Sequence, residues 1–379
     1  MNEQPSLDGL YSRSNRHSHA GPFVKHPGPE MLPQRVTETS TGTIEAVRAA
    51  EQTLTSATSD AGTCKRILIV GYTEVSRALA ARIRSNTSFG CDVVGFLDDE
   101  QHPDVLGSTK DLLSIARRCF VDKIVIATPV SNELKRAIDE ARREHINTEL
   151  IPESVVIFGP EQKTDSLAGF PTVVIYREEP SRLRVAVKRC IDILGAATGL
   201  LLLSPLFLVI AILVKLDSPG SVFYAHTRVG KKGRKFICYK FRSMISNANA
   251  LKNQMRHLNE LGNGFFFKIQ KDPRLTEFGS FLRRYSLDEL PQLFNVLRGD
   301  MSLVGPRPSP IDEFEMYDIS HFRRLDVKPG ITGLWQIIGR RNPDFDMAMT
   351  VDREYVDRWS LWLDLKILMK TVSVLCQGQ

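Results

Sequence analysis

The feature that most limits how this chain can fold is an apolar run without a charged residue, at positions 193–214. Such a run is long enough to form a transmembrane helix. Ser204 and Pro205 stand near its centre, where a proline removes a backbone hydrogen bond and its ring clashes with the preceding turn. The serine hydroxyl can bond to a carbonyl that this break releases. The sequence therefore predicts two helices joined at a bend.

Basic residues flank both ends of this run. They are Arg182, Arg184, Lys188 and Arg189 before it, and Lys215, Arg228, Lys231, Lys232, Arg234 and Lys235 after it. Because Lys and Arg mark the cytoplasmic side of membrane segments, the same charge at both ends favours a re-entrant hairpin at residues 186–216. A single-pass anchor and a buried helix of a soluble domain remain as alternatives. The hairpin predicts a monotopic protein of the cytoplasmic membrane that contacts lipids and faces the cytoplasm.

The remaining chain divides by composition. Residues 1–62 contain few large apolar side chains and no apolar core of a secretion signal, so we expect a disordered tail. Strand-like runs at 66–70, 92–97, 123–128 and 147–151 then alternate with helical stretches at 74–84, 110–118 and 132–144. This alternation predicts a Rossmann-like α/β domain with a parallel sheet at residues 63–160. Residues 161–183 are expected to connect it to a second, α+β domain at 184–379.

The first domain has an incomplete dinucleotide-binding pattern. Gly71 occupies the first glycine position of G-x-G-x-x-G, but Thr73 and Ser76 occupy the other two. Asp98 and Asp99 stand at the distance expected for a ribose contact, yet acids are common at strand ends. We therefore favour a structural or regulatory domain over a nucleotide-binding one.

Charge and cysteine usage limit the partners. The net charge of +6 favours acidic partners, namely phosphates, nucleic acid or an anionic membrane surface. Nucleic-acid binding does not explain the apolar run, so no nucleic-acid partner is expected, whereas a homodimer is possible. The six cysteines form no C-x-x-C pair, which argues against a zinc cluster and a disulfide scaffold.

Two adjacent carboxylates, Asp288 and Glu289, are the strongest candidates for chemistry. Pro291 is tolerated only in the first turn of a helix, so a helix should begin near residue 288 and end at Gly299. Both carboxylates would lie at the helix mouth and point about 100° apart, which suits two different roles. Alternatively, Ser286 and Glu289 form a capping box and have no chemical role.

Many cations of the second domain stand in settings that suit phosphate binding. They are Lys240, Arg242, Arg274, Arg283, Arg284, Arg307, Lys328, Arg340 and Arg341. Several lie beside Pro or Gly, which fix the backbone direction, and arginines bind phosphate oxygens through paired N–H groups. If these side chains converge they would suit a pyrophosphate; otherwise they are solvated surface charges.

These motifs, in this order, resemble the bacterial sugar transferase family, the monotopic polyprenyl-phosphate phosphoglycosyl transferases. The resemblance covers residues 184–376 and includes the basic entry, the Ser-Pro break, Asp-Ser-Pro-Gly at 217–220, Lys-Phe-Arg at 240–242 and Asp-Pro-Arg at 272–274. It continues through Ser-Leu-Asp-Glu-Leu-Pro at 286–291, Gly-Asp-Met-Ser-Leu-Val-Gly-Pro-Arg-Pro at 299–308 and Lys-Pro-Gly-Ile-Thr-Gly at 328–333. Larger members often carry transmembrane helices ahead of a Rossmann-like domain, and residues 1–62 hold no such run.

The resemblance implies an activity and roles. Asp288 would take a sugar-1-phosphate from a UDP-sugar, with release of UMP, and undecaprenyl phosphate would then accept it. Asp288 and Glu289 would hold Mg²⁺. The phosphate ligands would be Lys188, Arg189, Lys240, Arg242, Arg274, Arg283, Arg307 and one of Arg340 and Arg341. Family habit favours glucose or galactose and the first membrane step of exopolysaccharide, capsule or O-antigen synthesis.

Two other functions fit parts of the sequence. One is a catalytically silent membrane scaffold, which the intact Asp288-Glu289 pair argues against. The other is a nicotinamide-dependent sugar-nucleotide epimerase or dehydrogenase. Thr73 and Ser76 in place of glycines, and the lack of Tyr-x-x-x-Lys in the first domain, argue against it.

Overall fold

The computed structural model of the chain describes residues 64–152, 164–178, 181–245, 248, 251, 269, 272–339 and 344–377. These residues form two compact units, which meet in the sequence between Pro180 and Ser181. The tail expected at residues 1–62 lies outside the described residues.

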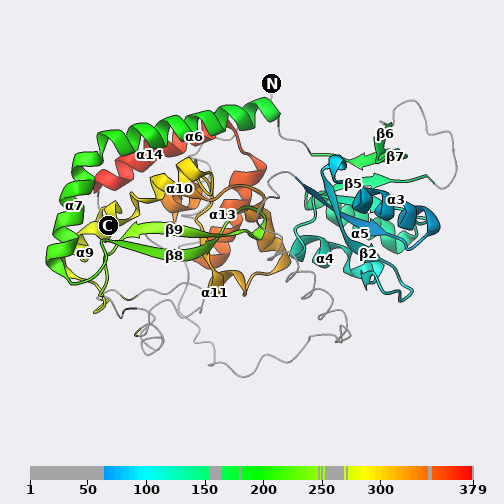
Figure 1. Ribbon diagram of the computed structural model, residues 1–379, viewed down its shortest axis with the longest axis horizontal. Coiled ribbons are helices and arrows are strands. Elements are labelled where there is room, and N and C mark those ends of the chain that lie inside the picture. Colours follow the sequence, from blue (N-terminus) through cyan, green and yellow to red (C-terminus); the bar gives the residue numbers. More distant parts are fainter. Residues whose placement is uncertain are drawn as a thin grey trace, which may run out of the picture. The chain divides into compact units, whose positions relative to one another are not determined.

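The N-terminal unit is built on one seven-stranded sheet with the order β3-β2-β1-β4-β5-β7-β6 (Figure 1). The first five strands in this order are parallel, as the sequence predicts, and β7 and β6 are antiparallel to their neighbours. The strands are β1 (Lys65–Val70), β2 (Cys91–Leu97), β3 (Val105–Gly107), β4 (Lys123–Ile126), β5 (Asn147–Leu150), β6 (Thr164–Leu167) and β7 (Phe170–Tyr176).

Helices cover both faces of this sheet. They are α3 (Glu74–Ser85), α4 (Leu112–Arg118) and α5 (Asn132–Arg143), with 3-10 turns η1 (Thr87–Phe89) and η2 (Thr109–Asp111). Successive strand residues point to opposite faces. On β1, Ile69 packs in one cluster with Leu79 of α3, and Leu68 packs in the other with Ile115 of α4 and Leu134 of α5. Each face therefore has its own buried layer.

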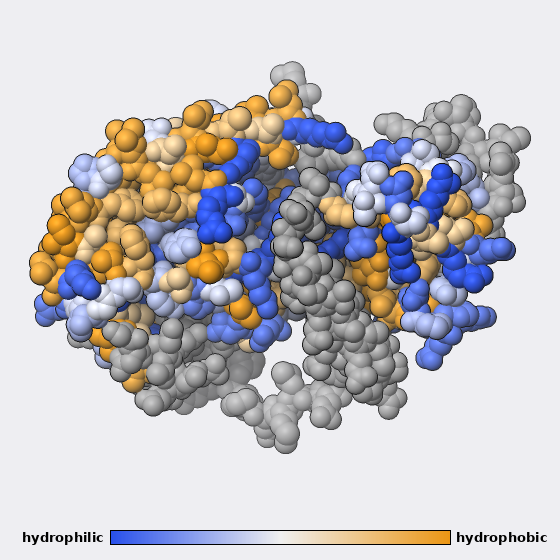
Figure 2. Space-filling model, in the orientation of Figure 1, coloured by the Kyte–Doolittle hydropathy of each residue, from blue (hydrophilic) through white to orange (hydrophobic). Residues whose placement is uncertain are grey.

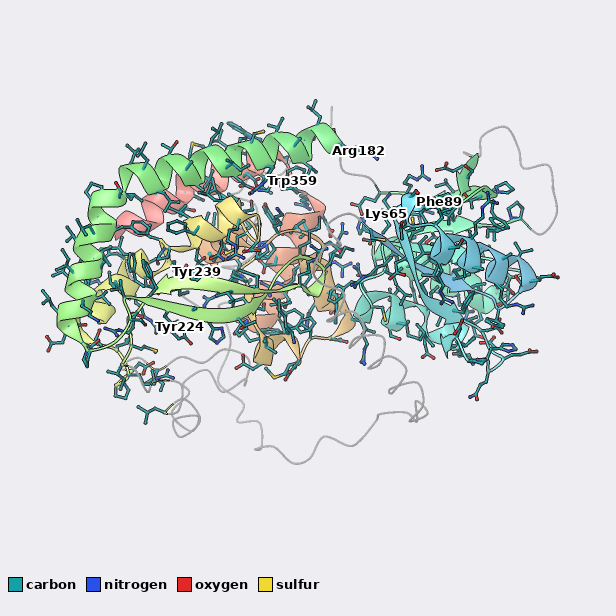
Figure 3. All side chains as sticks on the ribbon, in the orientation of Figure 1. Lys65, Phe89, Arg182, Tyr224, Tyr239 and Trp359 are labelled. Atoms are coloured by element: carbon teal, nitrogen blue, oxygen red, sulfur yellow. The ribbon has the colours of Figure 1, made fainter. Side chains whose placement is uncertain are left out.

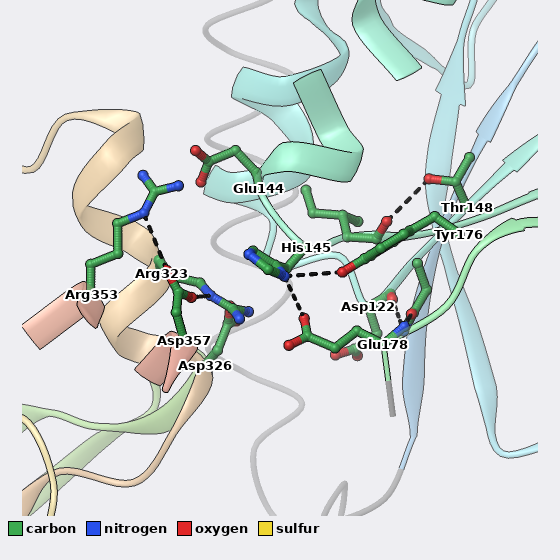
Figure 4. A network of polar contacts seen from close by, with 12 residues as sticks. Asp122, Glu144, His145, Thr148, Tyr176, Glu178, Arg323, Asp326, Arg353 and Asp357 are labelled. Carbon is green, nitrogen blue, oxygen red and sulfur yellow. Dashed lines mark hydrogen bonds and ion pairs between the residues drawn. The ribbon is translucent and has the colours of Figure 1, made fainter. Parts of the chain in front are cut away.

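The segment 161–183, expected from sequence to be a connection, contributes two strands to this sheet. β6 and β7 are joined by Ala168 and Gly169, whose φ angles are 49° and 84°. A two-residue turn with both φ angles positive suits a hairpin, but the two residues of such a turn are usually Asn-Gly or Asp-Gly. At the far end of β7, His145 Nδ1 lies 3.0 Å from Tyr176 Oη and 3.1 Å from a Glu178 carboxylate oxygen (Figure 4).

The C-terminal unit begins with two apolar helices, α6 (Arg182–Leu202) and α7 (Ser204–Asp217), which meet at an angle of 61°. The predicted break at Ser204 and Pro205 is confirmed, and the Ser204 hydroxyl donates to the Leu201 carbonyl at 2.8 Å. Among the described residues, no single helix has the length and apolarity of a membrane span. Taken together, the two helices of this bent pair reach that length and apolarity. Hydrophobic side chains gather over both helices (Figure 2). The most exposed are Leu183, Leu194, Leu201, Leu202, Leu208 and Leu216.

Two small sheets lie beneath these helices. The antiparallel pair β8 (Phe223–Val229) and β9 (Lys235–Phe241) carries β11 (Ser309–Pro310) on its β8 edge, and β10 (Ser302–Val304) pairs in parallel with β12 (Gly330–Thr332). Figure 3 shows Tyr224 and Tyr239 on the paired strands β8 and β9. The helical elements are η3 (Lys231–Gly233), α9 (Glu277–Arg284), η5 (Leu287–Glu289), α10 (Gln292–Arg298), α11 (Ile311–Phe314), η6 (Ile319–Asp326), α12 (Leu334–Ile338), α13 (Phe345–Asp357) and α14 (Leu361–Gln377).

Buried polar side chains join these elements. Asn295 of α10 is fully buried; its Oδ1 accepts from the Tyr239 N–H at 3.1 Å and its Nδ2 donates to the Ile237 carbonyl at 2.6 Å. Asp192 of α6 accepts from the Ser302 hydroxyl and the Leu303 N–H, both at 2.9 Å. Satisfied buried polar groups fix packing more specifically than apolar contact alone. As a result α10 is locked to β9 and α6 to β10.

Candidate active site

The carboxylate pair occupies a short turn between two helices. Asp288 and Glu289 lie in η5, after α9, and α10 begins just beyond Pro291, its N-cap residue. Gly299 ends α10 with a φ of 94°, so the predicted end of this helix is confirmed, whereas its start lies at Gln292 and not near residue 288. The carboxylates themselves precede α10 instead of lying in its first turn. Ser286, with a left-handed φ of 55°, turns the chain before them and separates η5 from α9.

The two carboxylates have different environments. Asp288 is buried, with 5% of its surface exposed, whereas the side chain of Glu289 is 26% exposed. Lys240 Nζ, on β9, lies 2.5 Å from Glu289 Oε1 and 3.7 Å from Asp288 Oδ2. The Glu289 carboxylate thus binds Lys240 instead of completing the capping box considered for Ser286. Lys240 therefore contacts both carboxylates, and the Glu289 carboxylate is the nearer of the two.

Their acidities are pushed in opposite directions. Burial raises the pKa of the Asp288 carboxyl above its usual value; Lys240 opposes this and the Glu289 charge adds to it. Burial alone would also raise the pKa of Glu289, but Lys240 and Arg307 outweigh it and lower that pKa to about 2. Neighbouring carboxyls with divergent pKa values are typical of sites where two acids have separate roles. Glu289 stays charged beside the cations, and Asp288 is the more basic of the two.

A small pocket lies beside Glu289 and is lined mainly by polar and cationic side chains. Its other lining residues are Arg228, Cys238, Lys240, Gln292, Arg307, Pro308, Gly330 and Gln336. Burial and the nearby Arg307 charge lower the pKa of the Arg228 guanidinium. Two guanidinium groups that repel each other favour an anion between them, and arginines suit phosphate oxygens. The structure therefore brings together Lys240 and Arg307 of the predicted phosphate ligands.

Arg228 was not among the predicted ligands; in the sequence it is one of the charges that follow the apolar run. Tyr224, His226 and Arg228 alternate along β8, and the register pairs Tyr224 with Lys240 and His226 with Cys238. Paired residues of antiparallel strands share a face. The alternation of these side chains was a usable signal, because it places Arg228 on the face that carries Lys240.

Two predicted phosphate ligands are bound elsewhere. The buried Arg242 donates to the carbonyls of Val214 and Pro219, each at 3.0 Å, and so closes the end of α7. Arg274 forms a two-pronged pair with Asp272, at 2.8 Å and 2.6 Å, within its own Asp-Pro-Arg motif. Both guanidinium groups are thereby engaged in holding local structure.

Lys188 and Arg189, expected to meet a membrane-side phosphate, point into the protein. Lys188 Nζ lies 2.6 Å from Asp364 of α14, which runs beside α6 (Figure 1). Arg189 donates to the carbonyls of Val296 and Leu297 at 2.6 Å and 2.9 Å, and so caps the end of α10. A basic side chain near the last carbonyls of a helix is favourable for the helix dipole.

The other predicted ligands divide into two groups. Arg283 is near the pair: its Nε donates to the Ser243 hydroxyl at 3.2 Å, and its charge lowers the pKa of Asp288. Arg340 and Arg341 lie outside the described residues.

In the N-terminal unit, the acids singled out as ribose contacts accept hydrogen bonds from neighbouring segments of the protein. Asp98 Oδ2 accepts from the Tyr72 N–H at 2.6 Å, and Asp99 Oδ1 accepts from the Thr109 hydroxyl at 3.0 Å. Gly71 has a φ of 97°, and a Cβ there would lie 2.7 Å from the Thr128 side chain. The glycine is therefore explained by close packing of β1 against the β4 end.

The fold and the site define a phosphate-handling enzyme domain that is preceded by a bent apolar helix pair. The chain belongs to the bacterial sugar transferase family, whose sequence profile matches residues 183–378, just over half of the chain. Residues 40–152 match the profile of a CoA-binding domain.

Three curated relatives carry informative names. The galactosyl transferase CpsE of Streptococcus agalactiae serotype III is 37% identical over 74% of this chain and 64% of its own length. The undecaprenyl-phosphate galactose phosphotransferase of Salmonella typhimurium is 35% identical over 82% of this chain and 68% of its own. The UDP-glucose:undecaprenyl-phosphate glucose-1-phosphate transferase of Xanthomonas campestris pv. campestris is 33% identical over 83% and 67%. The chain thus spans about two thirds of these relatives, and the names of the Salmonella and Xanthomonas proteins agree with the expected phosphotransferase class.

Proposed function

We propose that this chain transfers a hexose-1-phosphate from a UDP-sugar to undecaprenyl phosphate and releases UMP, with glucose or galactose as the hexose. The observation that carries the proposal is the pair Asp288 and Glu289, whose pKa values are driven apart beside Lys240, Arg228 and Arg307. The names of the curated relatives support the donor and the acceptor.

The proposed reaction has two displacements. A carboxylate oxygen of Asp288 attacks the β-phosphorus of the UDP-sugar; the bond from that phosphorus to the bridging oxygen breaks, and UMP leaves with this oxygen. The sugar phosphate is then bound to Asp288 as an acyl phosphate. A phosphate oxygen of undecaprenyl phosphate attacks the same phosphorus, and the acyl-phosphate bond breaks to restore the carboxylate. Lys240, Arg228 and Arg307 hold the negative oxygens in both steps.

Asp288 and Glu289 also suit Mg²⁺ as part of its ligand set. Mg²⁺ is commonly bound by one or two carboxylates together with substrate phosphates, and it neutralises charge on phosphate oxygens during displacement. The described residues contain no group of three or more His, Cys, Asp or Glu side chains placed to hold a metal by themselves. The two carboxylates would hold such an ion together with phosphate oxygens of the donor, where it would neutralise their charge.

Membrane attachment through α6 and α7 is part of the proposal. A re-entrant hairpin places both of its ends on the cytoplasmic side. Leu183 and Leu216, near these ends, are 73% and 77% exposed. In sealed spheroplasts, Leu183→Cys and Leu216→Cys should both resist an impermeant maleimide and react only after lysis. Labelling of the unsubstituted chain gives the background from the native cysteines. Labelling of Glu315→Cys, in the catalytic domain, shows how a cysteine on the catalytic side of the membrane reacts. Labelling of only one of the two end positions in intact spheroplasts would establish a span.

The activity is tested with purified protein, Mg²⁺ and a panel of UDP-sugars. We expect UMP release with UDP-glucose or UDP-galactose that depends on undecaprenyl phosphate for repeated turnover. Without the acceptor, a covalent intermediate predicts release of at most about one UMP per chain. Absence of turnover across the panel, with the acceptor and Mg²⁺ present, would support the alternative of a silent scaffold.

A further inference from the structure

The pocket beside Glu289 contains a hydrogen-bond acceptor that the proposed phosphate chemistry leaves unexplained. Gln336, on α12, lines this pocket with Arg228, Lys240 and Arg307. Its Nε2 donates to the Ile331 carbonyl at 2.9 Å, and this bond sets the orientation of the amide. Its Oε1 is buried and has no hydrogen-bond donor among the described residues.

An unsatisfied buried oxygen of this kind lowers the free energy of unfolding. A buried acceptor that loses its partner costs about 1–3 kcal/mol, and most buried polar atoms in proteins are satisfied. Of the neighbouring cations, Lys240 binds Glu289 and Arg228 donates to the Pro308 carbonyl at 3.3 Å. No described residue donates to the oxygen, so a donor group that enters the pocket would complete its hydrogen bonding.

The position of this oxygen is fixed by the fold. Leu334, Trp335 and Ile337 anchor α12 in the core, on either side of Gln336. At Gly333, the N-cap residue of α12, a Cβ would lie 2.7 Å from Gln336 Oε1 and 2.2 Å from the Gly305 carbonyl oxygen. Only a residue without a side chain leaves room for the amide oxygen here. A polar group on a rigid, well-packed element is suited to recognition.

We infer that Gln336 is a specificity residue, whose Oε1 accepts a hydrogen bond from a neutral N–H or O–H group of the nucleotide-sugar donor. The inference rests on the proposed function. It adds that the site recognises a hydrogen-bond donor of the nucleotide sugar as well as its phosphates. A pyrophosphate carries only acceptors, so it satisfies Arg228 and Arg307 but not Gln336. The ligand must join anionic oxygens to a neutral donor. A uridine imide or hydroxyl and a hexose hydroxyl both meet this requirement.

Binding to the full chain separates these sources. Gln336→Met keeps the length of the side chain and removes the acceptor. Calorimetry in the Asp288→Asn background, where no covalent intermediate forms, with pyrophosphate, UDP and UDP-glucose, each with Mg²⁺, should show unchanged pyrophosphate affinity and a loss of about 3- to 10-fold for UDP-glucose. A loss shared by UDP assigns the contact to the uridine, and a loss confined to UDP-glucose assigns it to the hexose; either result supports the inference. Retained pyrophosphate binding also shows that the variant is folded.

Donor analogues give a second, independent readout. Methylation of the uracil N3, or replacement of a hexose hydroxyl by hydrogen, should weaken binding to the natural chain. Gln336→Met should show little further loss with the analogue that lacks the contacting group, because the two changes remove one hydrogen bond. Additive losses for every analogue, or equal losses for pyrophosphate and UDP-glucose, would overturn the inference. A natural chain that binds pyrophosphate but no uridine nucleotide would overturn the proposed donor as well.

Discussion

Replacing Asp288 with asparagine is expected to reduce UMP release by roughly 10³-fold or more, because the amide cannot act as the nucleophile. The change conserves shape, and Asp288 is 5% exposed. Burial raises the pKa of this carboxyl, which means that the folded protein holds its charge at a cost. Asp288→Asn should therefore keep or slightly raise the melting temperature while activity is lost.

The measurement is steady-state UMP release, combined with a labelled UDP-sugar added without acceptor. The natural chain should retain label on the protein and lose it when undecaprenyl phosphate is added, whereas Asp288→Asn should retain none. Glu315→Gln, an exposed acid without a place in the pocket, is the matched control and should behave like the natural chain. Unchanged turnover in Asp288→Asn would refute the covalent mechanism.

The largest expected loss of stability follows from breaking the ion pair between Arg324 of η6 and Asp352 of α13. Only 5% of Arg324 and 1% of Asp352 is exposed, and two guanidinium nitrogens lie 2.7 Å and 3.0 Å from one carboxylate oxygen. Arg324 also donates to the Arg307 carbonyl at 2.8 Å and so supports the loop that carries this pocket cation. Asp352→Asn leaves a buried guanidinium without its counter-charge, which should cost about 3–5 kcal/mol in the free energy of unfolding.

Urea unfolding followed by tryptophan fluorescence measures this loss. The three tryptophans, Trp335, Trp359 and Trp362, all belong to the C-terminal unit, so the signal reports on that unit. The control is Glu354→Gln on the same helix, which breaks a pair with Arg358 that is 51% exposed at the arginine. Exposed pairs contribute about 1 kcal/mol or less. Similar small losses in both variants would contradict the assigned role of the buried pair.

A second set, the buried Arg323 with the more exposed Asp326 and Asp357, joins the same two elements (Figure 4). Arg323 donates to Asp357 at 2.9 Å and to Asp326 at 3.1 Å. Because these contacts remain in Asp352→Asn, the loss should appear as a shift of the transition, with η6 still attached to α13.

Local signals explain which parts of the fold could be predicted from sequence. The parallel strands of the N-terminal sheet are short apolar runs, and the break at Ser204 and Pro205 follows from proline chemistry alone. The hairpin of β6 and β7 was not predicted, because Ala168-Gly169 is a weak turn signal and because β7 also pairs with β5, an earlier strand. Pairing between strands that are separated in the sequence has no local sequence pattern from which it could be predicted.

In the site too, local sequence signals single out some residues, whereas the contacts of others depend on distant segments. Asp288 and Glu289 were singled out because a proline and a glycine limit their segment, and Lys240 and Arg307 because they stand in the Lys-Phe-Arg and Gly-Pro-Arg-Pro motifs. Arg189 was assigned to a phosphate, but its guanidinium caps a helix 107 residues further along the chain. Whether a basic side chain meets a ligand or a carbonyl depends on such distant contacts, and a charge looks the same in sequence in either case.

The contacts of α6 have a consequence for protein engineering. Lys188, Arg189 and Asp192 tie this helix to α14, to the end of α10 and to β10. Deleting residues 182–217 to obtain a detergent-free enzyme would leave the last carbonyls of α10 uncapped and strip β10 of its carboxylate partner. An unrelated hydrophobic anchor would not restore them. The apolar helix pair is therefore not an interchangeable module, and shortened variants that preserve the chemistry must retain its inward-facing polar residues.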